Sequence, residues 1–222
     1  MGNKEDQLYR EWDDWIDTLF GKTANLCTQR DIYHGVREIV RNNPNAQTPG
    51  DVFDWISVWY ASSMSVSVRQ LTDNRRGTIS YRRLLEGIKD HPCTISRTRF
   101  KSTFVDGNYK DFLADADFDR YVGAGREYID VNVVKEEIRL LKEKTNRLTD
   151  YVNNRVAHHS KNDFDAVPKH TDLDDAIDYL VTLHRRYHHI FKCSQLDDNN
   201  FVPNYGYDWK RVFRLPWLAA AQ

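Results

Sequence analysis

Apolar side chains recur at spacings of three and four residues along most of this chain, and that spacing places them on one face of an α-helix. Only 10 Gly and 6 Pro are spread over its 222 residues, so few positions interrupt these runs. No segment is a clear β-strand. The sequence therefore predicts an all-α protein, a helical bundle of about five to seven helices. The clearest run consists of Val134, Ile138, Leu141, Leu148 and Val152.

Capping residues and helix breakers set the boundaries of the predicted helices. Asp51, Ser80 and Thr171 each precede an apolar run, and each has a side-chain oxygen that can accept from the first free backbone N–H groups. The stretch 42–50 contains two Pro and one Gly, and the polar stretch 73–78 separates two further runs. The predicted helices cover residues 7–20, 26–40, 52–71, 81–89, 109–121, 132–156 and 172–191.

We expect the chain to form one domain over residues 1–222. Within it, residues 1–50 form an N-terminal helical extension, residues 51–193 the core bundle, and residues 194–222 an irregular aromatic tail packed on the bundle. The large side chains of this tail are Phe201, Tyr205, Tyr207, Trp209, Phe213 and Trp217. A second aromatic group shares helical stripes with aliphatic residues and is expected in the core: Trp12, Trp15, Trp55 and Trp59.

Charge and cysteine content argue against several classes of protein. The formal net charge of −1 gives no global attraction to nucleic acid or to a membrane surface, so such a partner needs a local patch. Cys27, Cys93 and Cys193 are odd in number and far apart, which argues against a disulfide framework or a zinc knuckle. No apolar run approaches the ~20 residues of a transmembrane helix, and the first residues do not resemble a signal peptide. We expect a cytoplasmic protein without a membrane partner.

The residues with the most reactive chemistry lie where the predicted helix 132–156 ends. Asn153, Asn154 and Arg155 are followed there by His158 and His159. Histidine can transfer a proton near neutral pH, and arginine offers a fixed cation to phosphate oxygens. The pair therefore suits phosphodiester cleavage without a metal ion, and these five residues are the candidate catalytic group. The alternative is structural, with the polar residues ending the helix and the histidines interacting with the negative end of its dipole.

Two segments resemble one family of helical proteins, and they do so in the family's order. Val152-Asn-Asn-Arg-Val-Ala-His-His159 resembles the HEPN superfamily of small helical bundles, and within it the abortive-infection HEPN-like family of bacterial phage-defence proteins. That family has an arginine-bearing helix end, an Asp, and a Ser-initiated helix with paired leucines. Val68-Arg-Gln-Leu-Thr-Asp73, followed by Ile79-Ser-Tyr-Arg-Arg-Leu-Leu85, is similar to this pattern. Together the similarities span residues 51–191.

The resemblance implies an activity and partners. The superfamily's active members are metal-independent endoribonucleases without a cofactor, in which two Arg/His motifs meet across a homodimer. Carried to this chain, His158 or His159 is the acid/base, Arg155 holds the phosphate, and Asn153 and Asn154 orient the substrate. The resemblance also implies a toxin of phage defence that acts on RNA, alone or with a second defence component.

The spacing of the motif leaves an alternative open. Active members have four to six residues between the Arg and the His, whereas Arg155 precedes His158 by three positions and His159 by four. The second prediction is therefore a non-catalytic helical interaction or sensing module that has lost the catalytic Arg. The third prediction is a metal-dependent enzyme that uses His184 and His188, which lie one turn apart on a predicted helix. The first two predictions involve no metal.

Basic residues concentrate between Arg69 and Lys101. This segment holds nine Lys and Arg residues against three acids, and the excess could contact an RNA backbone. The alternative is a solvated helix face and loop. The predicted RNA-binding residues are Arg69, Arg75, Arg76, Arg82 and Arg83.

Overall fold

The computed structural model describes residues 2–43, 52–104, 110–156, 168–202, 205 and 208–214. Within these ranges all regular structure is helical, apart from one isolated bridge between Ser96 and Tyr128. The prediction of an all-α protein is confirmed. The α-helices are α1 (Gly2–Arg41), α2 (Val52–Leu71), α3 (Tyr81–Asp90), α4 (Arg97–Thr103), α5 (Lys110–Val122), α6 (Val131–Tyr151) and α7 (His170–Lys192). The shorter helical turns are η2 (Pro92–Thr94), η3 (Val152–Val156, a π-helical turn), η4 (Asp198–Asn200) and η5 (Trp209–Arg214).

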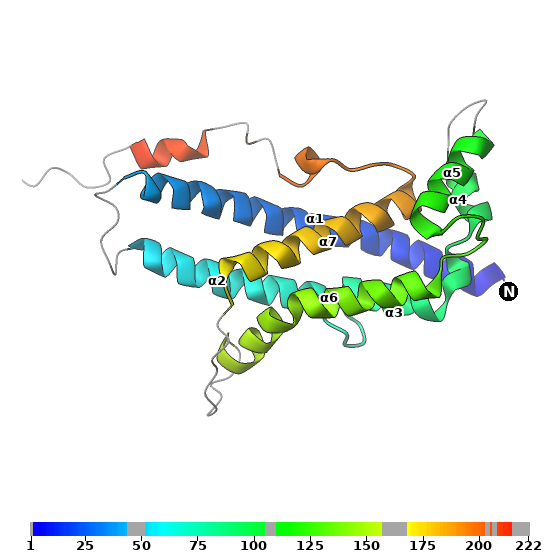
Figure 1. The fold of residues 1–222 in the computed structure, drawn as a ribbon, viewed down its shortest axis with the longest axis horizontal. Coiled ribbons are helices and arrows are strands. Elements are labelled where there is room, and N and C mark those ends of the chain that lie inside the picture. Colours follow the sequence, from blue (N-terminus) through cyan, green and yellow to red (C-terminus); the bar gives the residue numbers. More distant parts are fainter. Residues whose placement is uncertain are drawn as a thin grey trace, which may run out of the picture.

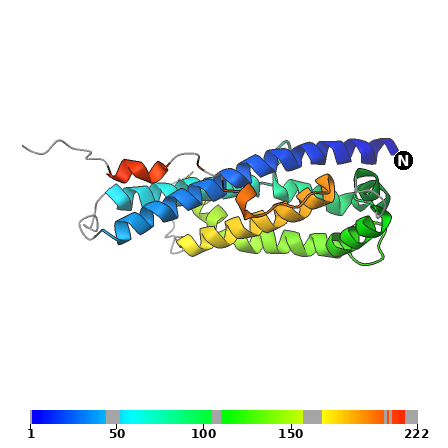
Figure 2. The same cartoon turned by 90° about the horizontal axis from the view of Figure 1, so that it is seen from above.

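Four long helices, α1, α2, α6 and α7, form the body of the molecule (Figure 1). Helices α1 and α6 each pack against both α2 and α7, so the four enclose one apolar core that includes the fully buried Ile16, Leu84 and Leu180. Helix α3 continues from α2 along α6, and α4 and α5 pack together at the end of the bundle where α1 begins (Figure 2). No helix in the described ranges is long and apolar enough to span a membrane.

Helix α1 is continuous over 40 residues, so the predicted break between residues 20 and 26 is wrong. The sequence there, Gly21 to Asn25, is polar but contains no proline that would end the helix. Thr23 is buried, and its hydroxyl lies 2.7 Å from the Tyr81 hydroxyl. The Thr23 hydroxyl is thus hydrogen-bonded inside the core, and α1 keeps one buried face from Leu19 to Leu26.

The predicted helix caps have different outcomes. Ser80 is the N-cap of α3, where its hydroxyl accepts from the backbone N–H of Arg83 at 3.1 Å, so this prediction is confirmed. Thr171 is not a cap, because α7 already begins at His170. The Asp172 carboxylate accepts there from the backbone N–H of Lys169 at 2.7 Å and satisfies the free donor. Asp51 lies outside the described residues.

The region between α3 and α6 is more helical than predicted. The expected helix at residues 109–121 is present as α5, shifted by one residue. Helix α4 was not predicted, because its seven residues bury only Phe100 and leave no periodic apolar pattern. Its start is defined instead by Ser96, whose hydroxyl accepts from the backbone N–H of Arg99 at 3.2 Å.

The tryptophans divide into two groups, although all four were predicted to lie in the core. Trp12 is 2% exposed, and Trp15 packs against the core. Trp55 and Trp59 are 61% and 63% exposed, so the prediction is wrong for them. The buried residues of α2 all belong to its second half, from Met64 to Leu71. A helical stripe reveals that residues share a face, but not whether another helix covers that face.

Parts of the aromatic tail pack on the bundle as predicted. Phe201 is buried beside Phe20, and the ring of Trp209 lies over Gly35 in α1, where a Cβ would be 2.7 Å from its nearest ring carbon. Phe213 is 40% exposed, and its ring contacts that of Trp209 edge to face. Tyr207 and Trp217 lie outside the described residues.

Candidate functional site

A polar cleft of about 320 Å³ brings together the two segments that the sequence singled out. Arg69 and Asp73 come from the end of α2 and the loop after it, and Asn153 comes from the π-helical turn after α6. Chain segments about 80 residues apart thus form one site. The described residues that line it are Arg69, Thr72, Asp73, Asn74, Arg82, Leu141, Lys142, Thr145, Asn146, Thr149 and Asn153.

Local hydrogen bonds hold the loop that forms one wall of this cleft. The Asp73 carboxylate accepts from the backbone N–H of Arg75 at 3.0 Å and from its guanidinium Nε at 2.7 Å. The Asp73 carbonyl accepts from the Ser80 hydroxyl, which ties the loop to the start of α3. Gly77, with φ +82°, supplies the left-handed backbone of the turn. Ser80, the N-cap of α3, therefore also holds the loop that places Asn74 at the cleft.

The cleft is positively charged. Arg69 is half-buried and Lys142 is exposed, and neither side chain makes a hydrogen bond or ion pair with any residue in the described ranges. Arg82 is anchored, because its guanidinium pairs with Glu86 at 2.6 Å and donates to the Ile138 carbonyl at 3.4 Å. Asp73 is the one acid in the lining, and the hydrogen bond from Arg75 lowers the pKa of its carboxyl. Two cations thus remain available to an anionic ligand.

One face of α6 supplies the polar floor of the cleft. Lys142, Asn146 and Thr149 follow one another at spacings of four and three, which aligns them on α6, and Asn153 of the following π-helical turn completes this side of the lining. Lys142 and Asn146 are not among the predicted site residues, although the polar stripe beside the apolar one on α6 is a signal that indicates them. The amides of Asn74, Asn146 and Asn153 have no hydrogen-bond partner in the part of the chain that the structure describes. Each can both donate and accept a hydrogen bond from a ligand.

The candidate catalytic residues are only partly within the described ranges. The Asn153 side chain lines the cleft, whereas the Asn154 amide donates to the Asp150 carbonyl at 2.8 Å. Arg155 is exposed and is not part of the cleft lining. The π-helical turn that carries these three residues has i→i+5 bonding, so side chains after Tyr151 no longer follow α-helical offsets. His158 and His159 lie outside the described residues.

The five arginines predicted to bind RNA differ in their partners. Arg75 pairs with Asp73 and Arg82 with Glu86. Arg69, Arg76 and Arg83 make no ion pair with a residue in the described ranges. The cations available for RNA are therefore fewer than the sequence count suggests.

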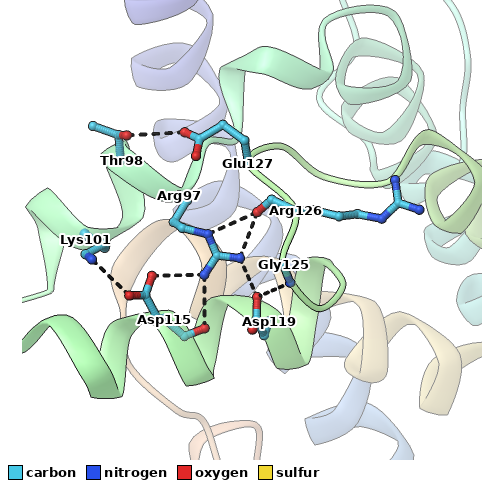
Figure 3. Close-up of polar contacts among 8 residues, drawn as sticks. All are labelled: Arg97, Thr98, Lys101, Asp115, Asp119, Gly125, Arg126 and Glu127. Carbon is cyan, nitrogen blue, oxygen red and sulfur yellow. Dashed lines mark hydrogen bonds and ion pairs between the residues drawn. The ribbon is translucent and has the colours of Figure 1, made fainter.

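Arg97 and Lys101, near the end of the basic segment, pair with acids that are distant in sequence. The Arg97 guanidinium donates to Asp115 at 3.0 Å and to Asp119, and also to the Arg126 carbonyl at 2.8 Å (Figure 3). Lys101 shares Asp115 at 3.0 Å. These bonds join α4 to α5 and to the loop before α6. We call Arg97, Lys101, Asp115, Asp119 and the Arg126 carbonyl the Arg97 cluster.

His184 and His188 lie in a setting different from that of a typical metal site. His184 is fully buried beside the rings of Phe20, Tyr81 and Phe201, and burial lowers its pKa to about 3. The His188 Nδ1 atom lies 3.1 Å from the Ser194 carbonyl. Within the described residues, no three His, Cys, Asp or Glu side chains gather as metal ligands.

The model of AbiU2, a family of the HEPN type, matches residues 9–212. Neither the curated proteins nor the solved structures contain a match to the chain.

Proposed function

The chain belongs to AbiU2, an abortive-infection family of the HEPN type, and on this premise we propose that it acts on RNA at the cleft between α2, α3 and α6. The observation that carries the proposal is the pair of cations Arg69 and Lys142, whose side chains make no hydrogen bond or ion pair within the described residues, in a cleft lined by side-chain amides. An RNA strand offers a phosphate for each cation, together with 2′-hydroxyls and base edges for the amides.

The proposed reaction is cleavage of a phosphodiester bond without a metal ion. His158 or His159 takes the proton of the 2′-hydroxyl, whose oxygen attacks the adjacent phosphorus, and the bond to the 5′-oxygen breaks. An acid returns a proton to that leaving oxygen, so the products are a cyclic phosphate and a free 5′-hydroxyl. Arg155 stabilises the additional negative charge on the phosphate oxygens. Asn153, which lines the cleft two residues earlier, orients the strand.

Cleavage without added metal tests this reaction most directly. Purified protein and labelled RNA are incubated in EDTA, and cleavage products are measured over time. His158→Ala or His159→Ala, whichever is the acid/base, should slow cleavage by at least about 100-fold. Unchanged rates in both variants, or products that depend on added metal, would contradict the assignment.

Binding without cleavage is the second candidate function, and one observation favours it. Asp73 is the one carboxylate that the described residues contribute to the cleft lining, and the hydrogen bond from Arg75 lowers its pKa, which makes it a poor proton acceptor near neutral pH. A sensing module that holds RNA through Arg69 and Lys142 needs no such base. Tight RNA binding with no products from several RNAs would favour this candidate.

The two candidates share the same partners. In both, the protein functions as a homodimer, alone or with a second component of the defence system. Both also require the cleft cations for RNA binding, so binding and cleavage are measured separately on each variant.

A further inference from the structure

The first half of α2 exposes an apolar surface that the RNA proposal does not use. Val52 and Val58 are 72% and 61% exposed, and Trp55 and Trp59 are exposed to a similar extent. Positions 52, 55 and 59 follow the spacing of three and four that aligns side chains along a helix. We call these four residues the α2 apolar patch. Exposed patches of this kind mark interaction sites more often than isolated surface residues do.

A groove of about 320 Å³ lies beside this patch, between α1 and α2. Ile32, Tyr33 and Val36 of α1 form one wall, and Ile56, Trp59 and Tyr60 of α2 form the other. The Tyr33 ring of α1 and the Tyr60 ring of α2 stack with centroids 3.8 Å apart, and the Tyr33 hydroxyl donates to the Ser57 hydroxyl at 3.1 Å. These contacts hold the two walls of the groove together. Trp59 belongs to both the patch and the groove. The α2 apolar patch and the groove therefore lie side by side on one face of the molecule.

We propose that this face binds a second copy of the chain, with the α2 apolar patch of each copy seated against the groove of the other. A two-fold axis brings the same surface of both copies together, and it pairs each projection with its partner's hollow. The four patch residues carry no charge, and Asp54 is the acid that lies beside them. The assignment gives a specific surface to the homodimer in the proposed function, but it does not require RNA cleavage.

The exposed tryptophans supply a substantial part of the area that a stable dimer needs. With about 250 Å² for a large aromatic side chain, two indoles that are about 60% exposed present roughly 300 Å². A stable interface buries about 800 Å² on each partner, so the two tryptophans alone provide more than a third of it. The two valines and the groove walls add to this area. Trp55 and Trp59 contact each other edge to face at 6.2 Å, which makes them a preformed anchor.

Sedimentation equilibrium of the full-length chain, without RNA, tests the proposal. At about 50 µM the wild type should have the mass of two chains, and Trp55→Glu/Trp59→Glu should have the mass of one, a loss of affinity of at least about 100-fold. Tyr128→Glu is the matched control, because Tyr128 is also an exposed aromatic residue, 45% exposed, but lies between α5 and α6. This variant should remain a dimer.

Val58→Arg keeps the test decisive if the double variant does not fold, because its side chain is already mostly exposed. Circular dichroism should show the helical content of the wild type, and the mass should again be that of one chain. A monomeric wild type, higher assemblies only, or a dimer that persists in both patch variants would overturn the proposal. RNA cleavage by the wild type, measured separately, would stand or fall independently of these outcomes.

Discussion

The polar cleft and the Arg97 cluster are built from the same kinds of residue, but their cations have opposite environments. The Arg97 guanidinium meets two carboxylates and a carbonyl from other elements, so its donors are already used within the protein. Arg69 lies in a cleft whose one acid is held by Arg75. An arginine of the first kind stabilises the fold, whereas one of the second kind is available to a ligand. The difference lies in the neighbouring acids, because the carboxylates that pair with Arg97 come from Asp115 and Asp119 in α5, which are distant in sequence.

The largest expected effect comes from removing the two free cations of the cleft. Arg69→Ala/Lys142→Ala should weaken RNA binding by about 100-fold, because each residue contacts a phosphate in the proposal. The slope of log affinity against log salt should fall by about 1.4, which corresponds to two contacts on a single strand. Fluorescence anisotropy at several salt concentrations measures both quantities. Lys135→Ala, on the same face of α6 two turns before Lys142 and outside the cleft lining, is the control and should change affinity less than twofold.

The converse result is expected at the Arg97 cluster. Arg97→Met keeps a similar length but removes the guanidinium donors of Asp115, Asp119 and the Arg126 carbonyl, although Lys101 still donates to Asp115. Thermal unfolding should therefore occur on the order of 5 °C lower. Anisotropy should show RNA affinity within twofold of the wild type. A large loss of RNA affinity in a folded Arg97→Met protein would remove the distinction between the two regions.

The acid dependence of stability should be smaller and specific to the Arg97 cluster. Hydrogen bonds from Arg97 lower the pKa of the Asp115 and Asp119 carboxyls below their usual 3.8. An acid whose pKa is lower in the folded state contributes stability above its unfolded pKa and loses it as pH falls through the folded value. Arg97→Met should therefore lose less stability than the wild type when pH falls from about 5 to 3. Equal losses in urea unfolding would show that these pairs contribute nothing measurable.

The smallest expected effect concerns the acid of the cleft. Arg75→Ala should weaken RNA binding by about threefold, because the Asp73 carboxylate is then no longer neutralised. Asp73→Asn combined with Arg75→Ala should restore the affinity. Anisotropy at low salt resolves this difference. Restoration would show that Arg75 acts through Asp73, and a persistent loss would show that Arg75 contacts RNA itself.

Local signals in the sequence predicted the individual elements well. Ser80 is a cap because its hydroxyl acts on the adjacent turn, and the apolar spacing of α6 reflects helix geometry alone. The predictions that failed depended on distant partners. Helix α1 continues past Thr23, whose buried hydroxyl is hydrogen-bonded to that of Tyr81. Trp55 is exposed, because the buried positions of α2 belong to its second half.

The candidate site was predictable in its motifs but not in its composition. The resemblance named the segments that contain Arg69, Asp73 and Asn153, and the structure brings these three residues to one cleft. Lys142 and Asn146 are not among the predicted site residues, because the prediction for their helix rests on its apolar face alone. The count of nine basic residues did not distinguish free from paired cations, because the acids that pair with Arg97 and Lys101 lie in α5.

Photo-crosslinking of an RNA that contains 4-thiouridine, followed by mass spectrometry of the peptides, tests the central claim most directly. RNA held in the cleft should crosslink to peptides that contain residues 69–74 and 142–153, and excess unlabelled RNA should suppress these crosslinks. The Arg69→Ala/Lys142→Ala variant should lose them. Crosslinks confined to peptides of α4 and α5, or unchanged in that variant, would contradict the assignment of the cleft as the RNA site.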